Sequence, residues 1–249
     1  MIIPLFILIL GLLIGSFLNV CIHRIPLNQT VVTEPSHCPV CGRRIKWYDL
    51  IPVVSYILLQ GKCRFCKNKI SIRYPLVELL NAAAYLLIYN TYGLSVQLLG
   101  MAFLVSALIV ISFIDFAHSI IPDRIIVVLL IAGIIYSFFN NSITILEAVI
   151  GFFAASVPLL IIAVLSGGNM GGGDIKLMAV SGLFLGWKLI LLSLILGSCI
   201  GSVIGIILIV LKKIKLKQRI PYGPFLSAGI FISIIYGQDF LRWYLNFYK

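Results

Sequence analysis

The stretch VPLLIIAVLSGGNMGGGDIKLMAVSGLFLG, residues 157–186, joins two apolar runs through a glycine-rich break that ends in Asp174. Apolar runs of this kind are typical of segments that enter a membrane. A carboxyl group at the edge of such a run is costly, because it loses hydration in lipid, and it is therefore a candidate for function. The stretch indicates a membrane protein with a functional carboxylate at the end of a span.

The rest of the chain has the same apolar character. Of its 249 residues, 61% are hydrophobic and 11% are charged, and the mean hydropathy is +1.13. A soluble domain has about a quarter charged residues. We therefore predict an all-α polytopic membrane protein whose first span is retained and not cleaved as a signal. About eight transmembrane helices are expected, at residues 2–20, 76–92, 96–114, 125–139, 143–165, 175–187, 189–211 and 223–241.

The positions of Lys and Arg predict how the spans are oriented. In the eight-span arrangement, most of the 19 basic residues fall on one side, and many of them lie within residues 24–73. Because basic loops are retained in the cytoplasm, we expect residues 24–73 in the cytoplasm and both termini outside. The basic run at residues 212–219 fits contact with anionic lipid better than contact with nucleic acid, so no nucleic-acid partner is expected.

Residues 24–75 are polar and form a predicted cytoplasmic insert between the first and second spans. A segment of this size usually needs a metal or a disulfide to fold. It contains two Cys-x-x-Cys pairs, Cys38 with Cys41 and Cys63 with Cys66. Disulfides or a redox-active pair are alternatives, but a cytoplasmic location argues against disulfides. Four thiolates match the tetrahedral set that Zn²⁺ prefers, so we predict a structural zinc site.

Two aspartates at the edges of spans are candidates for a catalytic pair. Asp115 closes the third predicted span and Asp174 opens the sixth, both on the expected cytoplasmic side. Two carboxyls that meet share one proton, so one can activate water while the other donates to a carbonyl. Glycines before Asp174 leave room for a substrate backbone, and they are Gly171, Gly172 and Gly173. Asp123 is more simply a helix cap or a structural acid.

Several motifs give the chain a resemblance to a known family. Together with the cysteine pairs, they are GSFLNVCIHRIP (15–26), ISIRYPLVELL (70–80), IDFAHSIIPD (114–123), MGGGDIKLMA (170–179) and PYGPFLSAG (221–229). In this order they resemble the bacterial type IV prepilin peptidases, which are GxGD-type intramembrane aspartic proteases and also N-methyltransferases. The resemblance runs nearly end to end. It implies that Asp115 and Asp174 are the catalytic pair and that the four cysteines hold the family's zinc.

The resemblance also implies a reaction. Members cleave the basic leader from prepilins and pseudopilins after a glycine, at the cytoplasmic face of the bacterial inner membrane. Many then methylate the new N-terminus with S-adenosylmethionine. The expected partners are prepilin helices and the bilayer, and the oligomeric state stays open. The expected division is a first helix at 1–23, the insert at 24–75, which is associated with the N-methyltransferase activity, and a peptidase core of about seven helices at 76–249.

The sequence offers few candidates for the site of methyl transfer. No glycine-rich loop after a strand is present, so a Rossmann-type donor site is not expected. Asn19 and Glu78 are candidates for contact with the substrate or the donor. Glu78 is equally well explained as an acid near a helix N-terminus.

A transporter or channel is the alternative to an enzyme. It would use the two aspartates as proton or cation sites, and it would place them near the middle of the bilayer. It does not explain the cysteine insert. A third possibility is a non-catalytic zinc-containing membrane scaffold, which would tolerate Asp115→Asn.

Overall fold

The computed structural model describes residues 2–32, 34–140, 142–167, 170–212 and 220–246. Within these ranges the chain is helical apart from loops and two isolated β-bridges, so the predicted all-α fold is confirmed. Most of the predicted basic run, residues 213–219, lies outside them. The elements are α1 (Ile2–Arg24), the 3₁₀ helix η1 (Trp47–Leu50), α2 (Val54–Leu58), α3 (Arg73–Tyr92), α4 (Val96–His118), α5 (Asp123–Phe139), α6 (Ile145–Leu165), α7 (Gly172–Val210) and α8 (Gly223–Asn246).

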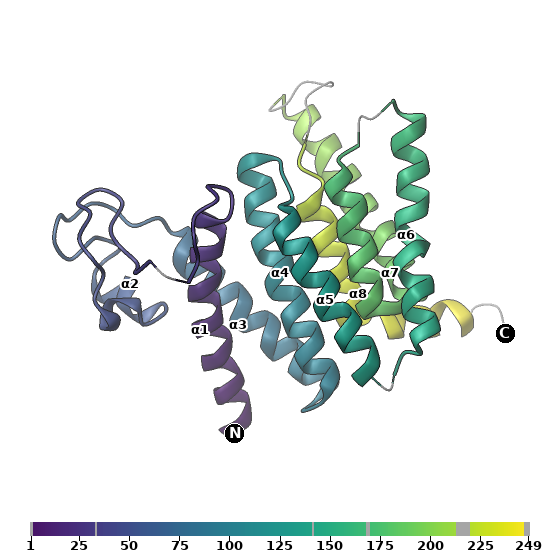
Figure 1. Cartoon of the computed structure of the whole chain (residues 1–249), viewed down its shortest axis with the longest axis horizontal. Coiled ribbons are helices and arrows are strands. Elements are labelled where there is room, and N and C mark those ends of the chain that lie inside the picture. Colours follow the sequence, from purple (N-terminus) through teal and green to yellow (C-terminus); the bar gives the residue numbers. More distant parts are fainter. Residues whose placement is uncertain (1, 33, 141, 168–169, 213–219, 247–249) are drawn as a thin grey trace. The chain divides into compact units, whose positions relative to one another are not determined.

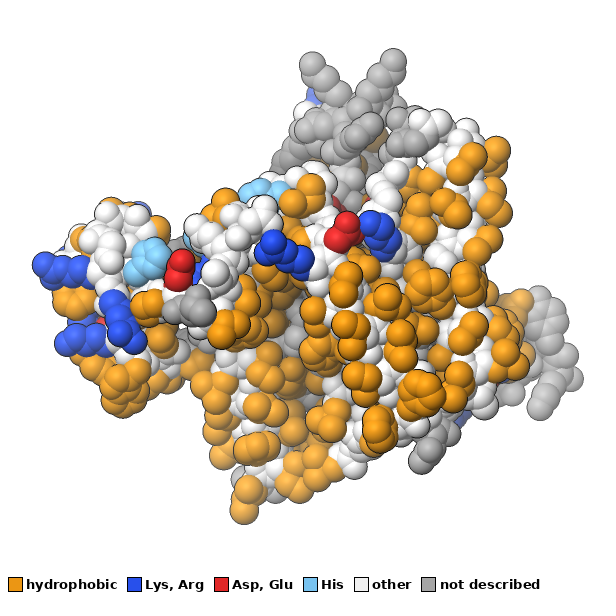
Figure 2. Space-filling view, in the orientation of Figure 1, with side chains coloured by type: hydrophobic (Ala, Val, Ile, Leu, Met, Phe, Trp, Pro, Cys, Tyr) orange, Lys and Arg blue, Asp and Glu red, His pale blue; other side chains and the backbone are white. Residues whose placement is uncertain are grey.

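Five of these helices, α1, α4, α6, α7 and α8, are long and apolar enough to cross a membrane. The chain divides into two compact units, residues 1–93 and residues 94–249. The first unit holds α1, the insert with η1 and α2, and α3, and the second is a bundle of α4 to α8 (Figure 1). Figure 2 shows that apolar side chains cover the face over α4, α5 and α6, as expected of a surface in contact with lipid.

In the first unit, α1 and α3 pack closely because glycines of α1 face α3. A Cβ atom on Gly11 would lie 2.7 Å from the Cα atom of Ala82, and one on Gly15 would lie 2.7 Å from the Cα atom of Glu78. The buried Asn81 amide donates to the carbonyl oxygen of Gly11 at 2.8 Å. Small residues and buried hydrogen bonds are what hold helices together in lipid, where burial from water gives no driving force.

In the second unit, α7 packs against two different helices. Gly182 in its first half lies directly against Gly151 of α6, and in its second half Gly197 lies against Gly229 of α8. Close backbone approach at paired glycines is a common way for membrane helices to associate. These contacts explain why α6 and α8 lie beside different parts of one long helix.

Helix α7 is in fact two helices joined at Gly186. Its 39 residues would span about 58 Å if straight, roughly twice the hydrocarbon core of a bilayer. Gly186 has φ 72° and ψ 173°, a conformation that is essentially restricted to glycine. Gly173 and Gly223 both lie against Ile121, and Gly205 lies against Ile220. Residues 173 and 205 are therefore at the same end of the bundle, and the chain turns back at Gly186.

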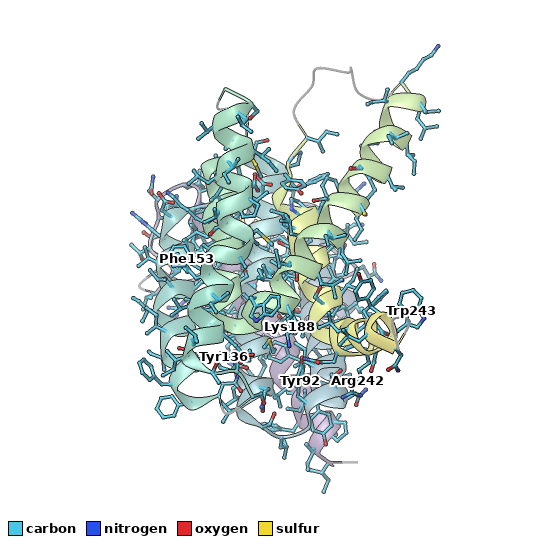
Figure 3. The ribbon with its side chains drawn as sticks, turned by 90° about the vertical axis from the view of Figure 1, so that its right-hand side faces the viewer. Tyr92, Tyr136, Phe153, Lys188, Arg242 and Trp243 are labelled. Atoms are coloured by element: carbon cyan, nitrogen blue, oxygen red, sulfur yellow. The ribbon has the colours of Figure 1, made fainter. Side chains whose placement is uncertain are left out.

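The two arms of α7 correspond to the predicted spans at 175–187 and 189–211. With them, each of the eight predicted spans has a helical counterpart, in α1, α3, α4, α5, α6, the two arms of α7, and α8. Gly186 lies near Ile143 and the carbonyl of Glu147, so the turn is beside the start of α6. Figure 3 shows Lys188, just after this turn, and Arg242, near the end of α8, in the same lower part of the second unit.

Gly186→Ala is expected to destabilise the protein by about 1–3 kcal/mol, because an L-residue is strained in this backbone conformation. Gly205→Ala is the matched control on the same helix, since its Cβ atom would make an ordinary 3.7 Å contact with Ile220. Thermal unfolding in detergent measures both. Equal melting temperatures for the two variants would show that the turn at Gly186 is not a constrained feature.

Candidate active site and metal centre

Asp115 lies in the last turn of α4. The helix ends because Ser119 adopts a left-handed conformation, with φ 54°, and its N–H donates to the Asp115 carbonyl oxygen at 2.7 Å. The Asp115 side chain is buried, and its Oδ2 accepts a hydrogen bond of 2.9 Å from the backbone N–H of Gly223. The start of α8 thus fixes a carboxylate at the end of α4.

Asp174 lies in the first turn of α7 and is also buried. The helix begins after Gly171, and the N–H of Asp174 donates to the Gly171 carbonyl oxygen at 3.2 Å. The partial positive charge at a helix N-terminus favours a carboxylate here. A Cβ atom on Gly171 would lie 3.1 Å from Oδ2 of Asp174, so this glycine leaves space for the carboxylate.

The two aspartates are brought together by contacts around Ile121. A Cβ atom on Gly173 would lie 2.8 Å from Cβ of Ile121, and one on Gly223 would lie 3.3 Å from Cδ1 of the same residue. Gly173 directly precedes Asp174, and Gly223 donates to Asp115, so the two carboxyl groups lie on either side of Ile121. Three segments distant in sequence therefore meet at one place: the end of α4, the start of α7 and the start of α8.

The glycine loop before Asp174 is open on one side. Gly171 and Gly172 are exposed, and a Cβ atom on Gly172 would meet nothing within 4 Å. Gly173 is packed against Ile121 instead. The buried Asp174 is thus next to exposed backbone that carries no side chains. The space beside this backbone is what an extended substrate chain needs.

Gly223, from the motif at residues 221–229, is also a residue of this site. It lies in the PYGP break before α8, and a Cβ atom there would come within 2.7 Å of Oδ2 of Asp115. The neighbouring Tyr222 hydroxyl shares a 2.7 Å hydrogen bond with Ser198 Oγ, which ties this break to the second arm of α7. The available signal was a glycine between two prolines, directly before an apolar run.

Asp123 is not part of the buried pair. It is the first residue of α5, and the N-cap position before it is occupied by Pro122. Its Oδ1 lies 2.7 Å from Nζ of Lys176, and both side chains are exposed. Such pairs contribute about 0–1 kcal/mol. Asp123 therefore acts as a structural acid that joins the starts of α5 and α7.

The four insert cysteines lie on two turns of the same backbone geometry. The N–H of Gly42 donates to the Cys38 carbonyl oxygen at 2.9 Å, and the N–H of Lys67 donates to that of Cys63 at 3.0 Å. Gly42 and Lys67 both have positive φ, 69° and 58°. Each turn is closed by one β-bridge, between His37 and Arg44 or between Lys62 and Lys69.

The cysteine sulfurs have the spacing of a tetrahedral metal site. The four Sγ atoms, on Cys38, Cys41, Cys63 and Cys66, all lie within 4.8 Å of one another. Cys38 Sγ and Cys66 Sγ are 3.8 Å apart. Tetrahedral zinc with bonds of about 2.3 Å to sulfur requires S···S distances of roughly this size. None of these cysteines forms a disulfide, and His37 is not in the cluster.

The backbone favours the thiolate form at Cys63, whereas burial and hydrogen bonds with the other thiols raise the pKa of Cys66 to about 11. Hydrogen bonds from the backbone N–H groups of Cys66 and Phe65 lower the pKa of the Cys63 thiol to about 7. Metal ligation requires deprotonated thiols, so a thiol already inclined to ionise binds a metal with less loss. The cluster can therefore hold a metal ion.

Asn19 and Glu78 both lie in the first unit, at the interface of α1 and α3. The Asn19 amide donates to the Tyr74 carbonyl oxygen at 3.0 Å, but its buried Oδ1 has no hydrogen-bond partner among the described residues. Glu78 is the sixth residue of α3, beyond its first turn, and its Oε2 accepts a 2.8 Å hydrogen bond from the N–H of Val53. Glu78 thus holds the insert to α3.

Comparisons with known proteins agree with this arrangement. Residues 9–92 match a family described as the bacterial peptidase A24 N-terminal domain, and residues 102–206 match the type IV leader peptidase family. No solved structure matches the chain significantly.

Curated relatives match over almost their whole length. A prepilin leader peptidase/N-methyltransferase of Pseudomonas aeruginosa is 34% identical, with 96% of this chain and 92% of the relative covered. Proteins of the same name from Aeromonas hydrophila and Bacillus subtilis are 34% and 31% identical. They cover 95% and 96% of this chain, and 91% and 96% of the respective relatives.

Proposed function

The chain belongs to the type IV leader peptidase family, and from this we propose that it is a prepilin leader peptidase and N-methyltransferase. It cleaves the basic leader from type IV prepilins and pseudopilins after a glycine, and it methylates the new N-terminal residue. The observation that supports this best is the meeting of Asp115, Asp174 and Gly223 at one buried place in a chain of this family. The transporter alternative is not favoured, because the relatives that span the chain are peptidases.

Cleavage follows from a pair of carboxyls that shares one proton. The ionised member takes a proton from a water molecule, which attacks the carbonyl carbon of the leader's last glycine. The protonated member donates its proton to the carbonyl oxygen. The proton taken from water then passes to the leaving amine as the C–N bond breaks, and the proton on the former carbonyl oxygen returns to the pair. The titration belongs to the pair, so neither aspartate alone is assigned as the base. The hydrogen bond from Gly223 fixes the orientation of the Asp115 carboxylate throughout.

The substrate approaches from the membrane. The apolar helix of the prepilin lies against the spans, and its peptide bond unwinds beside Gly171, Gly172 and Gly173. The exposure of Gly171 and Gly172 next to buried Asp174 supports this path. Because these glycines carry no side chains, an extended backbone can come within hydrogen-bond distance of the chain.

The four cysteines hold a structural zinc ion. Four protein thiolates leave no open position for water, so the ion closes the two turns of the insert and takes no part in the cleavage. Residues 24–75 form this insert, after a first helix at 1–23, and residues 76–249 form the peptidase core. The spacing of the sulfurs supports the zinc assignment.

S-adenosylmethionine supplies the methyl group. Two residues are proposed for contact with S-adenosylmethionine or the substrate. Asn19 is the better candidate, because its buried Oδ1 has no hydrogen-bond partner among the described residues and can still accept a hydrogen bond. Glu78 already accepts from Val53. Glu78 would therefore affect methyl transfer indirectly, by keeping the insert in position through its hydrogen bond with Val53.

The protein is a multi-pass protein of the bacterial inner membrane. The aspartates and the insert face the cytoplasm, and both termini face outside. The distribution of Lys and Arg supports this orientation.

Gly223→Ala is expected to lower the rate of cleavage about 100-fold, since a displacement of about 1 Å in a catalytic group has effects of this size. The new Cβ atom would lie 2.7 Å from Oδ2 of Asp115 and push the carboxylate aside. Gly205→Ala serves as the control, because its Cβ atom has room. The measurement is the initial rate at which each variant cleaves a purified prepilin. Equal rates for the two variants would exclude a positioning role for Gly223.

Mass spectrometry of a prepilin incubated with the purified protein, with and without S-adenosylmethionine, tests the function. We expect a mature product that begins after the leader's glycine in both reactions. With the donor, that product gains the mass of one methyl group. An uncut prepilin would overturn the peptidase assignment, and a cut but unmethylated product would overturn the second activity alone.

A further inference from the structure

An apolar surface in the insert has no partner among the described residues of its unit. Six large apolar side chains within twelve consecutive residues are exposed: Trp47, Leu50, Ile51, Val54, Ile57 and Leu58. We call these six residues the insert patch. Trp47 and Leu58 are each 77% exposed, and Ile57 is 66% exposed, so these are not side chains at the edge of a core. Contiguous exposed apolar surface of this kind marks a contact with another molecule or with a membrane.

One face of helix α2 packs against the rest of the insert, and the opposite face is exposed. On one face, Tyr56 packs against Gly61, and its hydroxyl donates to the Ile70 carbonyl oxygen at 3.4 Å. Val54, Ile57 and Leu58 stand at helical spacing on the other face. The fold of the insert does not need these three side chains.

The start of α2 is tied to the helix pair of α1 and α3. The N–H of Val53, directly before α2, is bound to Glu78, and the Cα atom of Glu78 lies against Gly15 of α1. Gly15 precedes the end of α1 at Arg24 by nine residues, or about 14 Å along the helix. Helix α1 is long and apolar enough to span a membrane. Through Glu78, the start of α2 is therefore held at a level short of the end of α1, and in Figure 1 α2 lies to the left of α1.

Basic side chains adjoin the patch. The insert between residues 25 and 72 has seven Lys and Arg residues against two acids. One of the acids, Asp49, is held by Arg64 through hydrogen bonds of 2.9 and 2.6 Å. Arg44 and Lys46 line a hollow of about 500 Å³ together with Trp47 and Tyr48. A basic hollow beside an apolar patch is complementary to an anionic headgroup above its acyl chain.

We propose that residues 44–58 are an interfacial anchor that inserts into the anionic bilayer on the insert's side of the membrane. The insert patch lies in the boundary between headgroups and acyl chains, and Arg44 and Lys46 contact lipid phosphates. Amphipathic segments bury their apolar face about 5–10 Å into this boundary. Tryptophan is enriched at the same level. The anchor would hold the insert flat on the membrane, independently of the peptidase reaction.

Fluorescence quenching of Trp47 in the full-length protein tests this proposal. The chain has three tryptophans, so Trp187→Phe and Trp243→Phe leave Trp47 as the reporter. The protein is reconstituted into phosphatidylglycerol vesicles with bromine near the headgroup end of the acyl chains. We expect blue-shifted emission and roughly twofold or greater quenching, because the bromines lie at the depth of an interfacial residue.

Matched variants separate the possible outcomes. Ile57→Asp with Leu58→Asp is expected to abolish the quenching, whereas Val32→Asp, at another exposed apolar residue of the first unit, leaves it unchanged. Emission typical of water without quenching would overturn the proposal. Blue-shifted emission without quenching would also overturn it, because the patch would then be covered by protein. Equal quenching in phosphatidylcholine would overturn the role of Arg44 and Lys46.

Discussion

Asp115→Asn and Asp174→Asn are each expected to lower leader cleavage by roughly 100- to 10,000-fold, the range of general acid–base catalysis. An asparagine can fill the same space but can neither take a proton from water nor donate one to the carbonyl oxygen. Both side chains are buried, so bulk water cannot substitute for the missing group. The measurement is the initial rate of cleavage of a purified prepilin by protein in proteoliposomes.

Asp123→Asn is the matched control. It removes a carboxylate from the same end of the second unit, but from an exposed side chain that only pairs with Lys176. We expect this variant to cleave at nearly the wild-type rate. Metal content and thermal unfolding of all three variants establish that they are folded. If Asp123→Asn lost as much activity as the other two, the assignment of the catalytic pair would be wrong.

Cys38→Ser is expected to remove the metal and unfold the insert. Structural zinc sites contribute apparent binding free energies of about 10–16 kcal/mol in small domains. The insert has little core to replace this, since its patch and much of its surface are exposed. We expect metal content to fall from about one ion per chain to a small fraction of that. Methyl transfer would be lost with it.

Elemental analysis and limited proteolysis measure these effects. Cys199→Ser is the matched control, because Cys199 is exposed and outside the four-cysteine cluster. We expect the Cys199→Ser variant to keep the metal, and its insert to stay resistant to the protease. A Cys38→Ser protein that kept a full complement of zinc and a protected insert would show that the cluster is not a four-sulfur site.

Spans and cysteine pairs could be predicted because they depend on local composition. Each helix of the bundle could be predicted from an apolar run, since a helix in lipid needs only length and apolar side chains. The Cys-x-x-Cys spacing likewise fixes two turns whose sulfurs converge. The expectation that Asp115 and Asp174 meet followed from both being at one end of their spans.

Other features depend on backbone conformation and on contacts between distant segments. The sequence predicted two spans around Gly186, but not that one glycine with φ 72° makes the whole turn. The hydrogen bond from Gly223 to Asp115 joins residues 108 apart, and no local pattern specifies it. The contact of Glu78 with the insert has no local signal either, since its Oε2 accepts from the N–H of Val53, where φ is 60°.

The most direct test of the central claim, that the two aspartates act as one unit, is the cleavage rate of the Asp115→Asn/Asp174→Asn double variant beside both single variants. Residues that act as a unit are strongly non-additive, so the double variant should be slower than either single one by no more than about threefold. Losses that multiply in the double variant would mean that the aspartates act independently. A single variant with near wild-type cleavage would contradict the aspartate-pair mechanism altogether.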